Sequence, residues 1–412
     1  MPATTIPLAH RATDLVGSVI DSSTSLLARQ THDVVRFAMG APGDDLIPVE
    51  MFDRYLGELS PGRYGYGATE GEPELIEQVL ALTHGRGVAS SADRITITTG
   101  GMQGLDLAGK LFLDPGDLVI VEGPTYTNGN STALSYGARL LEAPLDENGL
   151  VVERLEELVA RAGRTPKAIY TIPTFQNPSG ATLSRARRER LLDLADRWGA
   201  VIIDDDPYGM LRFEGEEVPG FAQIAPNHPL VFSVRTFSKI LAPGLRVGWV
   251  DADPALRPLL INAKQAMDTC TGVPAQRMVT RFLADDHLDA HLARIARLYR
   301  TRKDAMRHSL RRHFGERVRG TDPDGGFFLW LTFAGAWAEL DTRRLFEPAL
   351  RHGVAFIPGP AFSATGSFAN ALRLCFATSS PERIEEGVVR LRRAAEEVLA
   401  GRDRTRPPRV SN

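Results

Sequence analysis

Apolar residues along the chain form five short runs rich in β-branched side chains, each followed by a turn. These runs predict buried strands over residues 94–99, 118–121, 168–172, 200–203 and 230–234. Helical spacing of apolar residues occurs between strands, as over residues 152–162. Strands that alternate with helices predict an open, mostly parallel α/β sheet, in which ligands bind at the carboxyl ends of the strands.

The last third of the chain has a different pattern. An amphipathic stretch over residues 286–313 predicts a long helix that links two lobes. Strands over 324–331 and 370–376 follow it, and a closing helix is expected over 381–399. Two lobes also agree with the length of 412 residues, because a single core stops growing below that size.

Composition and charge exclude several classes of protein. The chain is 43% hydrophobic and 24% charged, as in soluble globular proteins, and its net charge of −3 argues against a nucleic-acid-binding surface. Its two cysteines, Cys270 and Cys375, fit reduced thiols better than a disulfide framework or a zinc site. Neither a signal peptide nor a membrane-spanning run is apparent. We therefore expect a cytoplasmic protein without nucleic-acid or membrane partners.

Candidate chemistry is concentrated in residues 235–249, directly after the strand over 230–234. The stretch reads Arg-Thr-Phe-Ser-Lys-Ile-Leu-Ala-Pro-Gly-Leu-Arg-Val-Gly-Trp. Lys239 stands at the carboxyl end of a strand, and a buried lysine loses proton affinity and becomes the neutral amine that a Schiff base requires. Arg246 follows seven positions later with a guanidinium suited to a phosphate. The alternative is a lysine at a strand end that has no chemistry.

This stretch resembles the cofactor-lysine motif of the fold-type I pyridoxal-phosphate aminotransferases of class I/II. The resemblance is to the aminoadipate and aromatic aminotransferase branch, which also supplies the catalytic-type domain of MocR regulators. It implies that Lys239 forms a Schiff base with pyridoxal 5'-phosphate. It also implies that Thr236 and Arg246 hold the cofactor phosphate and that Ser238 lies beside them.

Three more motifs follow strands in the order that this family shows. Gly101 and Met102 begin a helix after a glycine turn, where free backbone N–H groups suit an anion, and the resemblance assigns them to the phosphate. Tyr126 matches the aromatic residue that stacks on the cofactor ring. Asn177, in an Asn-Pro-Ser-Gly turn, matches the asparagine that bonds the phenolic oxygen of the cofactor, and we also expect it to contact substrate.

Three adjacent carboxylates, Asp204, Asp205 and Asp206, follow the strand over 200–203. Their mutual repulsion requires a nearby cation, so a magnesium site and an acidic loop without chemistry are alternatives to a cofactor role. In the family the aspartate lies three residues before a tyrosine. The resemblance therefore implies that Asp205 bonds the pyridine nitrogen and that Tyr208 holds the phenolic oxygen, and we count both as catalytic together with Lys239.

The substrate side of the site is expected from both ends of the chain. Gly40, in a Gly-Ala-Pro loop, resembles the family's pocket wall, where glycine lets the backbone approach a ligand. Arg373 lies in an apolar strand, where an unpaired charge is costly, and matches the arginine that binds the substrate α-carboxylate. Phe327 or Phe328 is expected near the substrate side chain.

One predicted contact crosses to a second chain. Tyr66, in a glycine-rich segment before a helix, matches the tyrosine that bonds the cofactor phosphate in the neighbouring subunit, although Tyr64 is an alternative. The resemblance thus implies a homodimer with shared active sites. The alternative is a structural role, since a tyrosine in a glycine-rich turn more often covers the edge of a hydrophobic core.

As a whole, the resemblance implies a large domain over 56–290 with a mostly parallel seven-stranded sheet flanked by helices, as in aspartate aminotransferase. A smaller α+β domain is expected over 291–400, with an N-terminal segment over 1–55 packing on it and a disordered tail over 401–412. Residues 11–30 have weak helical spacing. We expect no metal site.

The implied activity is transfer of an amino group between an L-amino acid and a 2-oxo acid. Because the same carbanion leads to racemisation, decarboxylation or oxidation and cyclisation, such chemistry in specialised metabolism remains an alternative. A non-catalytic, MocR-like ligand sensor is a third reading, which the short segment before the motifs and the low charge disfavour. Substrate choice depends on the divergent residues 11–30, 40–47, 269–273 and 327–328, so the donor and acceptor stay open.

Overall fold

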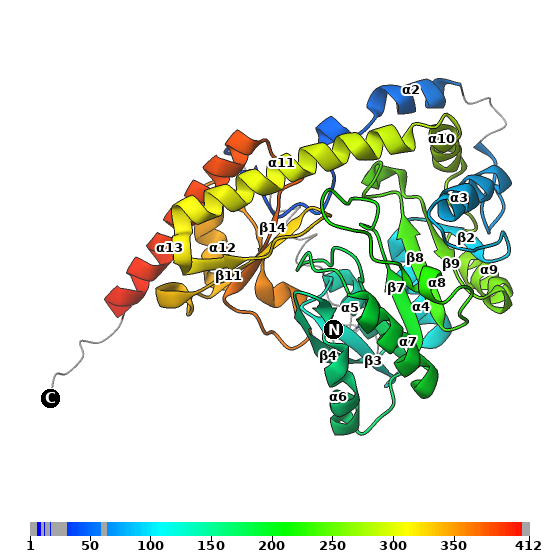
Figure 1. The fold of residues 1–412 in the computed structure, drawn as a ribbon, viewed down its shortest axis with the longest axis horizontal. Helices are drawn as coiled ribbons and strands as arrows, with labels where there is room; N and C mark the ends of the chain where they lie inside the picture. Colours follow the sequence, from blue (N-terminus) through cyan, green and yellow to red (C-terminus); the bar gives the residue numbers. More distant parts are fainter. Residues whose placement is uncertain (1–5, 10–11, 13–16, 18–30, 59–63, 406–412) are drawn as a thin grey trace, which may run out of the picture.

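The computed structural model describes residues 6–9, 12, 17, 31–58 and 64–405. Almost all of the helix expected over 11–30 lies outside these residues. A large lobe contains an eight-stranded sheet and a small lobe contains a four-stranded sheet (Figure 1). The long helix α11 (Leu288–Phe314) runs along both lobes, as the amphipathic pattern over 286–313 predicted.

The large sheet has the strand order β2-β9-β8-β7-β6-β3-β4-β5. Five central strands are parallel: β4 (Arg139–Asp146), β3 (Leu118–Gly123), β6 (Ala168–Thr171), β7 (Val201–Asp205) and β8 (Val231–Thr236). Antiparallel pairs extend the edges through β9 (Gly248–Asp251), β2 (Ile95–Thr98) and the short β5 (Gly149–Leu150). The expected mostly parallel sheet is therefore confirmed, and the two-residue β5 extends it from seven strands to eight.

Helices cover both faces of the large sheet, which explains its continuously apolar strands. Successive side chains of a strand point to opposite faces, so Val119 and Val121 pack into one core and Ile120 into another. The first core includes α3 (Pro73–Gly85), α4 (Gly101–Phe112), α5 (Thr127–Ser135), α9 (Arg257–Gln265) and α10 (Val273–Ala284). The second includes α6 (Leu155–Ala162), α7 (Arg185–Trp198) and α8 (Phe221–Ile224).

The small lobe is an antiparallel sheet covered by helices. Its strands are β10 (Val318–Gly320), β11 (Phe328–Phe333), β14 (Ala371–Cys375) and β13 (Ile357–Pro358), in that order. The helices α12 (Thr342–Arg351) and α13 (Pro381–Thr405) lie beside it (Figure 1). The helix α13 continues to Thr405, beyond the expected end at residue 399, so the tail expected to be disordered from 401 is helical over its first residues.

The chain before the large lobe contacts both lobes. The strand β1 (Val35–Arg36) pairs in parallel with β12 (Val354–Ala355) and so belongs beside the small lobe. The helix α2 (Val49–Gly57) packs against α10 instead. Within the described residues, no helix is both long and apolar enough to span a bilayer.

Candidate active site

A cavity of about 260 Å³ lies at the carboxyl ends of the parallel strands, where the large and small lobes meet. Among its lining residues are all but one of those for which the sequence predicted a cofactor or substrate contact. They are Gly40, Gly101, Met102, Tyr126, Asn177, Asp205, Tyr208, Thr236, Ser238, Lys239, Arg246 and Arg373. The exception is Tyr66. Motifs up to 333 residues apart in sequence, from Gly40 to Arg373, thus form one site.

Lys239 follows β8 and projects its amine into this cavity. Its Nζ donates a hydrogen bond to the carbonyl oxygen of Gly40 at 2.6 Å. Burial and the nearby positive charge of Arg373 lower the pKa of the Lys239 amine to about 8. About a tenth of the amine is therefore neutral at pH 7, several hundredfold more than for an ordinary lysine, and the neutral form is the one that attacks a carbonyl carbon.

The opposite end of the cavity is suited to a phosphate. The Arg246 guanidinium donates to Ser238 Oγ at 3.3 Å and to the carbonyl oxygen of Thr99 at 3.3 Å. The helix α4 begins at Gly101 without a side-chain cap, so its first N–H groups remain available to an anion. Gly100 has φ +74°, and a Cβ there would lie 2.5 Å from the guanidinium, so only glycine fits this turn.

Asp205 lies at the floor of the cavity, at the end of β7. Tyr170 of β6 donates a hydrogen bond to its carboxylate at 2.9 Å. Burial raises the pKa of the Asp205 carboxyl to about 7, and burial also raises that of the neighbouring Glu122 to about 7. A buried carboxyl of this kind gains most from a cationic partner inside the cavity, such as a protonated ring nitrogen.

The two flanking acids have partners outside the cavity. Arg235 forms an ion pair with Asp204 at 2.6 Å, which supplies the cation that the three adjacent carboxylates require. The carboxylate of Asp206 accepts the backbone N–H of Gly209 at 2.7 Å. No group of three metal-ligating side chains occurs among the described residues, so nothing there supports the magnesium alternative.

Arg373 lines the cavity beside Phe328. Its side chain is 1% exposed and its guanidinium lies 4.0 Å from the ring centre of Phe328. It donates to Asn177 Oδ1 at 2.9 Å and to the carbonyl oxygen of Ala38 at 2.8 Å, while its buried Nε has no partner. Burial lowers the pKa of Arg373 to about 10. A buried guanidinium without a carboxylate partner is suited to an anionic ligand.

Aromatic side chains surround the ring position between these two ends. Tyr208 is buried and packs edge-on against Phe327 and Phe328, with ring centres 5.2 and 5.8 Å away. Phe328 lines the cavity, whereas Phe327 packs behind it against Tyr299, so the sequence alternative resolves to Phe328. Tyr126 lines the cavity next to Met102, with its hydroxyl 3.7 Å from the methionine sulfur.

Tyr66 and Tyr64 lie outside this chain's own cavity. Tyr66 is 89% exposed and Tyr64 is 66% exposed. The expected pocket segment over 269–273 also lies elsewhere, on the far side of the glycine turn, where Thr271 bonds to Lys264. A role for these residues at a cofactor therefore requires a second chain.

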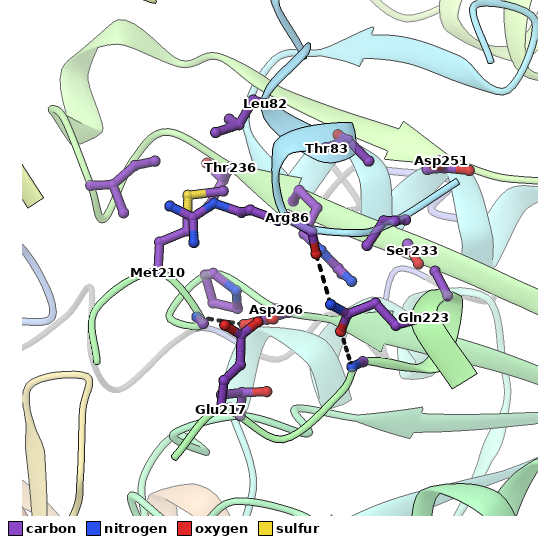
Figure 2. Close-up of a pocket in the computed structure, with 18 of the residues that line it drawn as sticks. Leu82, Thr83, Arg86, Asp206, Met210, Glu217, Gln223, Ser233, Thr236 and Asp251 are labelled. Atoms are coloured by element: carbon purple, nitrogen blue, oxygen red, sulfur yellow. Dashed lines mark hydrogen bonds between the residues drawn. The ribbon is translucent and has the colours of Figure 1, made fainter. Parts of the chain in front are cut away.

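A second cavity, of about 120 Å³, adjoins the first, because Pro207 and Thr236 line both. Gln223 donates to the carbonyl oxygen of Arg86 at 2.7 Å, and Asp206 faces the same space (Figure 2). The buried Nε of Arg86 has no hydrogen-bond partner. Of the predicted site residues, Thr236 alone lines it. The first cavity is therefore the candidate active site.

Several residues that shape the site were not predicted. Tyr170 bonds Asp205, Arg235 neutralises Asp204, and Met39, Leu105 and Ile172 line the cavity. Arg235 directly precedes Thr236 in the cofactor-lysine motif, so its position next to the acidic strand end was the available signal. Tyr170 has no comparable signal, because its partner is known only once β6 and β7 are paired.

The lining fits pyridoxal 5'-phosphate on its own chemistry. The glycine turn and Arg246 offer donors for a phosphate, and Lys239 offers a buried amine for an aldehyde. Asp205 offers a carboxylate with a raised pKa for a ring nitrogen. The unpartnered Nε of Arg373 then remains for the carboxylate of a substrate.

Comparisons with known proteins agree with this geometry. The family model for aminotransferases of class I and II matches residues 33–391. The aromatic-amino-acid aminotransferase 1 of Thermococcus litoralis is 36% identical over 90% of both chains. The 2-aminoadipate transaminase of Thermus thermophilus is 36% identical over 90% of this chain and 92% of its own.

A solved structure supports the same conclusion. The kynurenine aminotransferase of Pyrococcus horikoshii, crystallised with PMP, has a TM-score of 0.88 at 35% identity and covers 95% of this chain and 97% of its own. Sequence, cavity and structural similarity thus agree over nearly the whole length. The chain belongs to the class I and II aminotransferases, and its cofactor is pyridoxal 5'-phosphate.

Proposed function

We propose that this aminotransferase acts on an L-amino acid with a large apolar or aromatic side chain and a 2-oxo acid, and that the cavity residues act as follows. The buried, carboxylate-free guanidinium of Arg373 is the observation that carries the proposal. Its Nε binds the substrate α-carboxylate and so fixes the orientation of the Cα–H bond. Asn177, which already accepts a hydrogen bond from Arg373, holds the guanidinium in place.

Side chains of the cavity then transfer the Cα proton of the substrate. The bound cofactor withdraws electrons from the substrate Cα. With the cofactor and substrate bound, Lys239 Nζ, whose pKa is lowered to about 8 in the cofactor-free chain, would take the proton from the substrate Cα and give it up again within the cavity. Asp205 supports the electron withdrawal, because its carboxylate keeps the pyridine nitrogen protonated. Closure of the cavity by both lobes limits access of water to these steps.

The side-chain preference follows from the wall of the cavity near Arg373. Met39, Ala41 and Phe328 line this region. Among the described lining residues the cations are Lys239, Arg246 and Arg373, and each already has a role. A second substrate carboxylate would therefore lack a partner there, whereas an aromatic ring would pack against Phe328. The relatives named for aromatic amino acids and kynurenine support this choice, whereas the equally similar relative named for 2-aminoadipate has a dicarboxylic substrate in its name, so a dicarboxylic donor is the competing outcome of the test.

We also propose a cytoplasmic homodimer in which Tyr66 reaches the phosphate site of the partner subunit. Two facts support it: Tyr66 is 89% exposed in the single chain, and the Arg246 end of the cavity is open. An aromatic side chain this exposed in one chain fits a contact with a second chain, where its ring is covered and its hydroxyl can find a hydrogen-bond partner. Cys270 and Cys375 are free thiols, as suits a reducing compartment.

A panel of amino donors tests this function. The protein loaded with pyridoxal 5'-phosphate is mixed with L-phenylalanine, L-tyrosine, L-2-aminoadipate or L-aspartate and with 2-oxoglutarate, and the products are separated by chromatography. We expect kcat/KM for the aromatic donors to exceed that for aspartate by about tenfold or more, as one poorly paired buried charge implies. A preference for the dicarboxylic donors would contradict the side-chain assignment. No amino transfer from any donor would contradict the function itself.

A further inference from the structure

A buried polar cluster lies behind the glycine turn, outside the cavity. We call it the Lys264 cluster; its members are Lys264, Asp268, Gln103, Thr99 and Thr271. The Lys264 side chain is 0% exposed and its Nζ donates to both carboxylate oxygens of Asp268, at 2.8 and 3.0 Å. The same Nζ donates to Gln103 Oε1 at 2.8 Å and to Thr271 Oγ1 at 3.0 Å.

This cluster is bonded directly to the turn that faces the cofactor. The Gln103 side-chain oxygen accepts the backbone N–H of Thr99 at 2.8 Å. Asp268 accepts the Thr99 hydroxyl at 2.5 Å and the Gln103 amide at 2.8 Å. The carbonyl oxygen of Thr99 in turn accepts from Arg246 at 3.3 Å. Thr99 is thus held by side chains on one side and by the phosphate arginine on the other.

The turn needs such support because of its own sequence. Its residues after Thr99 are two glycines and Met102, so no side-chain hydroxyl or amide is available there to bond a phosphate. Backbone N–H groups must do so, and glycine restricts the backbone less than any other residue. The direction of those N–H groups therefore depends on what fixes Thr99 and the first turn of α4. Lys264 and Asp268, 161 and 165 positions after Gln103, supply that constraint.

We propose that Lys264 and Asp268 are positioning residues for the cofactor phosphate: they fix Thr99 and Gln103 so that the N–H groups of Gly101 and Met102, together with Arg246, point at one anion. The proposal rests on the proposed function insofar as the anion is the phosphate of pyridoxal 5'-phosphate. The Lys264 side chain is fully buried, whereas the Asp268 side chain is 26% exposed. Taking the lysine charge out of water costs desolvation energy that an apolar side chain avoids, so a buried Lys264 with four acceptor atoms calls for a role beyond stability.

A second buried ion pair, at the other end of the strand that precedes the glycine turn, offers a matched control. Arg94 and Asp251 form another buried ion pair, at 2.8 Å with side chains 8% and 10% exposed. This pair lies at the amino end of β2, whereas Thr99 follows its carboxyl end, about 16 Å away at strand rise. Arg94→Met and Lys264→Met each remove the cation of a buried pair. The two variants share a cost in stability and differ in their distance from the turn.

The test measures the dissociation constant of pyridoxal 5'-phosphate and of pyridoxal, which lacks the phosphate, by equilibrium dialysis against the cofactor-free protein. Lys264→Met is expected to raise the dissociation constant of pyridoxal 5'-phosphate by about tenfold or more. The dissociation constant of pyridoxal should change by less than about twofold. Arg94→Met should change neither constant. In Lys264→Met, kcat at saturating cofactor should stay near that of the wild type, because Lys239 and Asp205 are untouched.

Equal weakening of pyridoxal and pyridoxal 5'-phosphate in Lys264→Met would overturn the proposal, as would equal effects of Lys264→Met and Arg94→Met. If Lys264→Met does not fold, Asp268→Asn replaces it, since the amide keeps the shape of the side chain and one acceptor oxygen; it must show the same selective loss. These binding constants do not require turnover. Failure of the positioning role is therefore distinguishable from failure of the proposed amino transfer.

Discussion

Asp205→Asn is expected to stabilise the cofactor-free protein while removing most of its activity. Burial raises the pKa of Asp205 from 3.8 to about 7. An acid whose pKa is higher in the folded state costs stability once it ionises in the unfolded chain. The cost is absent below pH 4, grows between about pH 4 and pH 7, and is constant above. A shift of about three units corresponds to ~4 kcal/mol at pH 8.

The asparagine removes this cost but adds one of its own. Its amide keeps an oxygen for the Tyr170 hydroxyl and brings N–H groups that lack acceptors, at about 1–2 kcal/mol. The net gain in the free energy of unfolding is therefore roughly 2–3 kcal/mol at pH 8, and the two effects nearly cancel at pH 5. Activity should fall about a hundredfold or more, because the carboxylate that supports electron withdrawal is lost.

Urea unfolding of cofactor-free wild type and variant at pH 5 and pH 8 provides the measurement. Asp204→Asn is the matched control: it is also buried and one residue away, but it leaves Arg235 without its ion-pair partner. That variant should lose about 3–5 kcal/mol. A variant Asp205→Asn that is no more stable than the wild type at pH 8, or whose difference does not change with pH, would refute the reasoning.

Three further predictions follow from the cavity. Lys239→Ala should abolish turnover, and borohydride reduction of the wild type followed by mass spectrometry should mark Lys239; another marked lysine would contradict the assignment. Arg373→Met should raise KM for the amino donor about tenfold or more in initial-rate measurements, with an unchanged dissociation constant for the cofactor; the reverse pattern would place Arg373 at the cofactor. Mixed dimers of Lys239→Ala and Tyr66→Ala chains should regain activity at one site in two; mixed dimers without activity would keep Tyr66 within its own chain.

The sequence predicted those parts of the site that depend on the ends of single strands. Lys239, Asp205 and Asn177 follow apolar runs with β-strand character, and parallel strands bring their carboxyl ends to one edge. Three strands of the large sheet gave no such run: the two-residue β5, and β4 and β9. The residues of β4 are mostly half-exposed, and β9 is four residues long and begins with glycine. Their place in the sheet is set by pairing with β3 and β8, which a local pattern does not contain.

Contacts between residues far apart in the sequence could not be predicted either, because a local hydrophobic pattern does not show which elements pack together. Lys264 gains its hydrogen-bond partners only where α9 packs against α4. Tyr170 likewise gains its role only from the neighbouring strand. The position of Tyr66 depends on a second chain. Local sequence thus predicts which groups meet at the sheet edge, whereas the residues that hold those groups in place require the tertiary structure.

The hydrogen bond from Lys239 to Gly40 also connects the two lobes. Phe37 and Ala38, just before Gly40, accept hydrogen bonds from Cys375 and Arg373 of β14, so this segment is bonded to the small lobe. The free amine thus bridges the lobes at 2.6 Å. Once its nitrogen is covalently bound to a carbonyl carbon, it has fewer hydrogens to donate, and the bridge is released. A Schiff base at Lys239 would therefore remove one contact between β8 and the segment bonded to the small lobe, so the cofactor-free chain would have an interlobe hydrogen bond that the loaded chain lacks.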